Sequence, residues 1–112
     1  MTKNDEPSVD CGVASDRAVL RGVMRLESVD AYEELFAPIS ERVAATSEAY
    51  SIDISAVPLM NSSGIRALAS LVLEAKDAGC KLVLIGCQSV AWQRKSVPSL
   101  QALYDELEVQ LH

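Results

Sequence analysis

The run Asn61-Ser62-Ser63-Gly64 contains the residues of this sequence that are best suited to chemistry. Apolar residues at helical spacing follow it, so we expect a helix to begin here with Asn61 as its cap. A serine in the first turn of a helix lies beside free N–H groups and the positive end of the helix dipole, which both favour an anion. A phosphate on Ser62 adds about −1.5 to −2 charges, and the helix end offsets its local cost by roughly 0.3–1 kcal/mol. The run therefore predicts either a plain helix cap or a site at which Ser62 accepts a phosphate.

Serine also serves as a nucleophile, but activation requires a base within hydrogen-bond reach. The only histidine is His112, the last residue, and the Gly-x-Ser-x-Gly pattern of hydrolases is absent from the sequence. Asp30 and Asp53 could pair as acid and base, yet lone acids at helix caps and strand ends are common. We therefore expect a non-enzymatic protein with no catalytic site.

The three cysteines, Cys11, Cys80 and Cys87, do not have the spacing of a metal site. The sequence also has no glycine-rich nucleotide loop, so we expect neither a metal nor a cofactor. It shows no signal peptide and no long apolar run, which predicts a cytoplasmic protein without membrane association. In that compartment the thiols stay reduced, and we expect them to be small core residues.

The 112 residues fit one domain, and a hydrophobic content of 49% is sufficient for a core. The formal net charge is −6. An acidic surface repels phosphate backbones, so a nucleic-acid partner is not expected. Residues 1–7 are polar and charged and predict a flexible N-terminal tail, which leaves residues 8–112 as the domain.

Short apolar runs alternate with helical patterns, which predicts an α/β fold. The expected strands cover residues 9–13, 18–24, 50–55, 81–85 and 107–111. The expected helices cover residues 30–48, 61–79 and about 89–105. Asp30 and Glu33 have the spacing of a capping box, and Pro38 predicts a kink or break near Ala37. Pro98 could likewise open a separate last helix, which gives three to four helices.

The first two strands are close in sequence and predict an antiparallel hairpin with a turn at 15–17. The later strand–helix–strand units predict parallel neighbours, so the whole is a mixed sheet of four to five strands. Residues 81–85 are the most hydrophobic and predict a central strand buried on both faces. The last strand is expected at an edge of the sheet, where it could support a homodimer.

The segment from Ile52 to Ile65 resembles the strand–loop–helix signature of STAS domains, a family named for sulphate transporters and anti-sigma factor antagonists. Asp53-Ile54-Ser55 stands where the family has an Asp-Leu-Ser-like triplet, and Asn61-Ser62-Ser63-Gly64 stands where it has Asp-Ser-Ser-Gly. The similarity of pattern extends from about Ser8 to Ile85 and weakens beyond Gly86. This resemblance implies a single-domain STAS-like fold.

The resemblance also implies a function, that of an anti-sigma factor antagonist-like module in a bacterial partner-switching pathway. Ser62, or alternatively Ser63, would be phosphorylated by a partner serine kinase, an anti-sigma-type ATPase, and a PP2C-type phosphatase would reverse the modification. The implied partner-binding residues are Asp30, Asp53, Asn61, Ser62, Ser63, Gly64 and Ile65. Asn61 departs from the family's Asp, so an alternative is a STAS domain without phosphorylation that acts as a scaffold or a small-ligand sensor.

Overall fold

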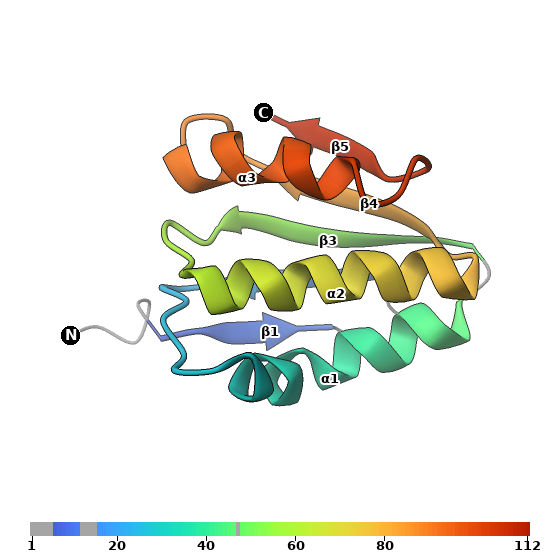
Figure 1. Cartoon of the computed structure of the whole chain (residues 1–112), viewed down its shortest axis with the longest axis horizontal. Coiled ribbons are helices and arrows are strands. Elements are labelled where there is room, and N and C mark those ends of the chain that lie inside the picture. The colour runs from blue at the N-terminus through green and yellow to red at the C-terminus, as the bar shows by residue number, and fades with distance from the viewer. Residues whose placement is uncertain (1–5, 12–15, 47) are drawn as a thin grey trace.

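A computed structural model describes residues 6–11, 16–46 and 48–112 of the chain. Figure 1 shows a sheet at the back, with helices covering the face toward the viewer. The strands are β1 (Ser8–Asp10), β2 (Arg17–Arg21), β3 (Ala49–Ala56), β4 (Lys81–Gly86) and β5 (Glu108–Leu111). The helices are α1 (Val29–Ala45), α2 (Ser62–Ala78) and α3 (Ala91–Gln101). The predicted α/β class is confirmed.

The sheet has the strand order β1-β2-β3-β4-β5, which is also the order along the chain. β1 pairs with β2 antiparallel, and the remaining neighbours are parallel. The predicted mixed sheet with an antiparallel N-terminal pair is therefore confirmed. Each parallel pair is joined by one helix, and right-handed crossovers that always advance in the same direction place their helices on the same face. The other face of the sheet receives no helix in the described part of the chain.

This one-sided arrangement corrects the prediction for residues 81–85. β4 is an interior strand, paired with β3 and β5, but it is not buried on both faces. Leu82 and Leu84 are buried under the helices, whereas Val83 and Ile85 are only half-buried on the opposite face. The high hydrophobicity of the segment suggested burial on both sides, but burial on one side requires only every second residue to be apolar.

Helix α1 begins one residue earlier than predicted, and its cap lies two residues earlier. Its N-cap is Ser28, whose hydroxyl oxygen accepts a hydrogen bond from the Ala31 N–H at 3.1 Å. The prediction that Asp30 caps the helix is wrong, since Asp30 lies inside the first turn, where its charge suits the helix dipole. The prediction of a break at Pro38 is also wrong, because the helix continues through it. Its buried residues on both sides of the proline hold the two halves against the core; they are Tyr32, Phe36, Ile39 and Val43.

Packing against the core also keeps the last helix continuous through a proline. Pro98 lies inside α3, between the buried Val97 and Leu100, so one helix replaces the two that the sequence allowed. This helix ends at Gln101 rather than near 105, and the buried Tyr104 and Leu107 lead into β5. The predicted helix-to-strand change is confirmed, although its boundary lies earlier than expected.

Both ends of α2 agree with the sequence prediction. Asn61 is its N-cap, and Gly79 ends it in the left-handed conformation with φ of 71°. The N–H of Gly79 donates to the carbonyls of Ala75 and Lys76, as a glycine C-cap does. The Asn61-Ser62-Ser63-Gly64 run thus begins a well-capped, 17-residue helix.

The three cysteine thiols differ in burial. Cys80 is fully buried, which confirms its predicted core position, and burial raises its pKa. Cys11 is half-buried and packs against the core, whereas Cys87 lies nearer the surface with its Sγ 2.9 Å from the Ser89 hydroxyl. Cys87 is not among the residues that form or pack on the core, so the core prediction is wrong for it, and hydrogen bonds from Ser89 lower its pKa. Residues 1–5 of the predicted tail and residues 12–15 of the predicted hairpin lie outside the described residues.

Candidate functional site

The side chain of Asn61 connects three segments at the start of α2. Its Oδ1 accepts hydrogen bonds from the Tyr32 hydroxyl at 2.8 Å and from the Gly64 N–H at 3.1 Å. Its Nδ2 donates to the carbonyl of Leu26 at 2.9 Å. The partners fix the orientation of the amide, because the N–H of Gly64 needs an acceptor and the Leu26 carbonyl needs a donor. Asn61 therefore uses both ends of its amide, which a carboxylate cannot do.

Tyr32 completes this network from α1. Its hydroxyl accepts from the Leu26 N–H at 3.1 Å while it donates to Asn61. Burial raises the pKa of Tyr32, and the hydrogen bond from Leu26 only partly opposes this shift. The hydroxyl thus stays protonated and able to donate at physiological pH, so it locks α1 to the start of α2.

Gly64 has a structural role in the motif. A Cβ at this position would lie 2.5 Å from Cγ of Met60 and 2.9 Å from Cζ of Tyr32. Both neighbours are buried, with Tyr32 at 0% and Met60 at 4% exposure, and neither can move away freely. A glycine is therefore required for α2 to pack this closely on the buried tyrosine, which explains the last position of the Asn-Ser-Ser-Gly run.

The two serines between these fixed residues are more accessible. Ser62 is exposed and Ser63 is half-buried. The N–H groups of Gly64 and Ile65 bond to the side chain and the carbonyl of Asn61, respectively. The N–H groups of Ser62 and Ser63 have no hydrogen-bond acceptor among the described residues. The helix start therefore offers an exposed hydroxyl together with donors that suit an anion.

The loop between β3 and α2 carries an exposed apolar side chain three residues before Ser62. This residue, Leu59, is 37% exposed. Its backbone carbonyl accepts a hydrogen bond from the Met24 N–H at 2.9 Å. The N–H of Asn61 donates in return to the Met24 carbonyl at 3.0 Å. These two hydrogen bonds hold the loop to the segment after β2, while the apolar side chain of Leu59 stays exposed to solvent. Leu73, three turns along α2, is also exposed, at 42%.

Gln93 fixes the other end of this loop, and sequence reasoning missed it. Its side chain is completely buried, and Nε2 donates to the carbonyls of Ile54 at 2.7 Å and Val57 at 3.0 Å. Its Oε1 accepts from the Cys87 N–H at 2.7 Å. The neighbouring Trp92 donates from Nε1 to the Val57 carbonyl at 2.8 Å. The available signal was a polar residue on the buried side of the last helix. Its hydrogen-bond partners come from distant segments, so the sequence did not identify them.

Asp53 lies apart from Ser62, on the face of the sheet that the helices leave open. The alternation along β3 buries Ile52 and Ile54 under the helices and turns Asp53 to the opposite side. Its carboxylate pairs with the Arg17 guanidinium at 2.9 Å and accepts from the backbone N–H of Ser55 at 2.9 Å. Burial disfavours the charged form, but the hydrogen bonds from Ser55 and Arg17 outweigh it, and the pKa of Asp53 falls below its usual value.

The predicted partner-binding residues are thus only partly brought together. Asn61, Ser62, Ser63, Gly64 and Ile65 form one continuous helix start. Asp30 is exposed in the first turn of α1, and Figure 1 shows that α1 and α2 begin toward the same end of the molecule. Asp53 belongs to the opposite face of the sheet. Within the described ranges, no group of three or more histidine, cysteine or acidic side chains could hold a metal ion.

The fold and this helix start define the class of the protein. The STAS domain model matches residues 25–94, more than half of the chain, so the chain belongs to the STAS domain family. The match covers α1, β3, α2 and β4, including the whole Asn-Ser-Ser-Gly run. No curated protein matches the chain in sequence.

Solved structures support the same fold. One is the crystal structure of diguanylate cyclase SiaD in complex with its activator SiaC from Pseudomonas aeruginosa, with a TM-score of 0.70, 14% identity and coverage of 99% of this chain and 96% of that chain. Another is an anti-sigma factor antagonist from Mycobacterium paratuberculosis, with a TM-score of 0.64, 15% identity and coverage of 96% of this chain and 90% of that chain. The identities are low, so these similarities establish the fold only. None of the helices in the described ranges is long and apolar enough to span a membrane.

Proposed function

We propose that this chain is a non-enzymatic, cytoplasmic protein-binding module of a bacterial partner-switching pathway, controlled by phosphorylation of Ser62. The observation that carries the proposal is the contrast within one motif. Asn61 and Gly64 are committed to packing and hydrogen bonding, whereas Ser62 between them is exposed. A rigid frame around one accessible hydroxyl suits a residue that a kinase must reach without unfolding the domain.

The local chemistry accommodates a phosphate on Ser62. The N–H groups of Ser62 and Ser63 point out of the first turn of α2, and the helix dipole favours negative charge there. Arg66 is exposed one turn further along the helix, at a spacing from which a guanidinium reaches a phosphate. The modified protein is therefore expected to keep its fold, so that the phosphate acts on the partner rather than on the domain.

The effect on a partner follows from the surroundings of Ser62. A partner that covers the exposed Leu59 and the helix start would bury the serine hydroxyl in an apolar contact. A phosphate in that contact would be desolvated, and Arg66 would offset only part of its charge of about −1.5 to −2, so the cost is roughly 2–5 kcal/mol. This cost corresponds to an affinity loss of about 30-fold or more. We propose a serine-kinase ATPase of the anti-sigma type as this partner, and a PP2C-type phosphatase as the enzyme that restores binding.

A second candidate is a STAS domain that binds its partner without phosphorylation, as a scaffold, an activator of an enzyme or a small-ligand sensor. Two observations favour it. Asn61 is built into the fold through its amide donor, so a kinase that reads an aspartate at this position finds none. The similarity in fold to the complex of a cyclase with its activator shows that proteins of this shape also occur with enzyme partners.

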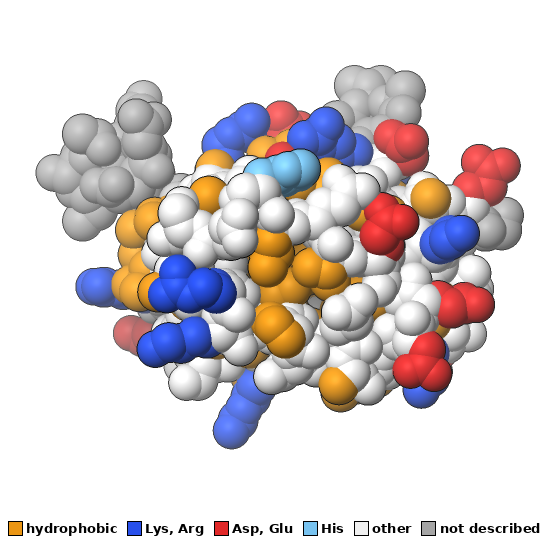
Figure 2. Space-filling view, turned by 90° about the horizontal axis from the view of Figure 1, so that it is seen from above, with side chains coloured by type: hydrophobic (Ala, Val, Ile, Leu, Met, Phe, Trp, Pro, Cys, Tyr) orange, Lys and Arg blue, Asp and Glu red, His pale blue; other side chains and the backbone are white. Residues whose placement is uncertain are grey.

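A homodimer through β5 stays a subsidiary proposal. β5 is the last strand in the sheet order and contains only four residues. Figure 2 views the molecule from the side of α3 and β5, and hydrophobic side chains reach that surface only in small areas among polar atoms. Such a surface suits a weak contact better than a permanent one.

The deciding experiment combines intact mass spectrometry with a binding assay. The protein purified from its native host is expected to carry a phosphate that fragmentation places on Ser62. The Ser62→Asp variant should lose binding to a co-purified serine-kinase ATPase, while Ser62→Ala retains it. Ser99→Asp, at an exposed position on α3, is the matched control for added charge. Absence of phosphate in every growth condition, with equal binding by Ser62→Asp and wild type, would favour the unphosphorylated alternative.

A further inference from the structure

A groove runs between α1 and α2 on the helical face, away from the open side of the sheet. Its volume is about 480 Å³, and it is lined by Glu33, Phe36, Ala37, Ser40, Glu41, Ala67, Ser70, Leu71 and Glu74. The floor is apolar, since Phe36 and Leu71 are almost completely buried, and the small side chains on both helices leave room above them. The groove therefore combines an apolar base with enough width for a long side chain.

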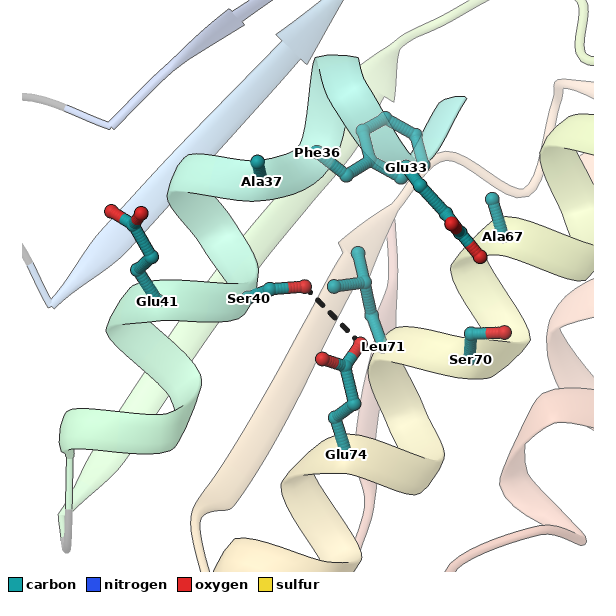
Figure 3. Close-up of a pocket in the computed structure, with 9 residues that line it drawn as sticks. All are labelled: Glu33, Phe36, Ala37, Ser40, Glu41, Ala67, Ser70, Leu71 and Glu74. Atoms are coloured by element: carbon teal, nitrogen blue, oxygen red, sulfur yellow. Dashed lines mark hydrogen bonds between the residues drawn. The ribbon is translucent and has the colours of Figure 1, made fainter. Parts of the chain in front are cut away.

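Carboxylates border this groove from both helices. Figure 3 shows Glu33 of α1 directed toward Ala67 and Ser70 of α2, and Glu74 of α2 facing Ser40 of α1. The Ser40 hydroxyl donates to Oε2 of Glu74 at 3.2 Å, and this bond directs the exposed glutamate toward the groove. Glu41 is directed away from α2 in the same view. None of the lining residues, all of which the structure describes, is basic.

We infer that this groove docks a basic segment of a partner protein. A lysine or arginine side chain has an aliphatic stem that can lie on the apolar floor and a cationic end that can reach Glu33 or Glu74. Ser40, which bonds Glu74, lies seven residues after Glu33, so the two carboxylates are reached from positions about 10 Å apart along α1 at the usual helical rise, or roughly two turns of a docked helix. Two cationic side chains one to two turns apart would therefore meet the two carboxylates.

The charge of the whole chain argues against a second copy as the occupant. The sequence has 16 acidic and 10 basic residues, so two copies repel each other. Its densest basic cluster is the single pair Arg94-Lys95 in α3. A partner with a basic amphipathic helix complements the groove, whereas this chain does not complement itself.

The groove is separate from the proposed switch at Ser62. Its residues on α2 follow the spacing of Ala67, Ser70 and Glu74, and one turn earlier this side of the helix holds Ser63. Ser62 lies on the neighbouring side, in line with Arg66 and Leu73. The groove proposal consequently does not depend on phosphorylation of Ser62, and a failure of either leaves the other standing.

The test uses the full chain labelled with ¹⁵N and a short amphipathic helical peptide of leucine and lysine. Amide shifts are expected to change along both walls of the groove, with saturation and with weaker binding at higher salt. A matched peptide with glutamate in place of lysine should not bind. The double variant Glu33→Gln/Glu74→Gln should bind the lysine peptide about tenfold more weakly than wild type. Glu48→Gln/Glu108→Gln removes the same charge from exposed positions elsewhere and should bind like wild type.

A second variant keeps the proposal testable without deleting acidic residues. Ser70→Lys places a long cation in the groove from an exposed position on α2 and should block the peptide to a similar extent. The inference is overturned if the shifts map to another surface, or if the groove variants bind within about twofold of the control. It is also overturned if sedimentation shows a homodimer of the wild type that Ser70→Lys dissociates.

Discussion

Asn61 uses both ends of its amide, so its replacement by Asp tests the account of the helix start directly. The substitution keeps the size of the side chain and restores the residue that the STAS motif usually has. It also keeps an acceptor for the Tyr32 hydroxyl and the Gly64 N–H. What it removes is the donor to the Leu26 carbonyl, which lies 2.9 Å away. At neutral pH a carboxylate oxygen would then face a carbonyl oxygen.

The expected cost follows from opposing contributions. Leaving a partly buried carbonyl without its donor costs about 1–3 kcal/mol. A charged acceptor at the helix N-terminus returns roughly 0.3–1 kcal/mol through the dipole and strengthens the two hydrogen bonds that remain. We therefore expect Asn61→Asp to lower the free energy of unfolding by about 1–2 kcal/mol, which corresponds to a fall in Tm of roughly 4–10 °C for a domain of this size.

Urea unfolding at neutral pH, followed by circular dichroism, measures this difference directly. Asn61→Ser is the matched comparison, because a serine can also cap the helix but does not reach across to Leu26. Tyr32→Phe removes the hydroxyl that donates to Asn61, and its cost should be larger in the Asn61→Asp background, where the acceptor is charged.

The reasoning also predicts a dependence on pH. At acidic pH a protonated carboxyl group at position 61 can donate to the Leu26 carbonyl, so the deficit of Asn61→Asp should shrink. A variant as stable as wild type at neutral pH, or a deficit that grows on acidification, would refute the claim that the amide donor matters.

Three further substitutions test other parts of the structure. Gly64→Ala brings a Cβ to 2.5 Å from Cγ of Met60 and should destabilise by about 1–3 kcal/mol in thermal unfolding, although alanine favours helices; a raised Tm would contradict this packing argument. Gln93→Leu removes a buried hydrogen-bond partner from two carbonyls and one N–H, and it should lower the free energy of unfolding by at least about 2 kcal/mol. Gln88→Leu, at an exposed position, is the control and should have little effect. Equal effects of the two substitutions would show that the buried amide is not needed. Asp53 has a pKa below its ordinary value of 3.8, so its charged form stabilises the fold above that pH and this contribution is lost as the pH falls through the lower folded pKa. Asp53→Asn should therefore flatten the acid limb of the curve of unfolding free energy against pH. An unchanged acid limb would assign that limb to other groups.

The order of the elements could be read from the sequence because local patterns encode it. Alternation around Val9 and helical spacing around Leu68 are properties of neighbouring residues, and glycine at position 79 needs only its own backbone conformation to end a helix. The right-handed crossover rule then gives parallel neighbours without knowledge of any side-chain contact. The resemblance to the STAS signature rested on the same short-range spacing.

Errors arose where distant packing overrides a local preference. Pro38 and Pro98 each weaken a helix locally, yet buried residues on either side keep α1 and α3 continuous. The cap of α1 is Ser28 rather than Asp30, since both residues are good caps and only the docked position of the helix selects one. The burial of β4 on one face follows from where the crossovers place the helices, which is a property of the whole sheet.

At the candidate site, too, some features follow from local sequence and others from contacts between distant segments. The sequence by itself determined that a helix begins at Asn61-Ser62-Ser63-Gly64, whereas modification of Ser62 stays a prediction. Only the tertiary structure decided which members of the run are accessible, because Tyr32 and Leu26 engage Asn61 from segments about 30 residues away, and Tyr32 together with Met60 leaves no room for a side chain at Gly64. It likewise separated Asp53 onto the other face and formed the acidic groove from two helices. Contacts between remote segments depend on how the helices pack on the sheet, and no local pattern contains that information.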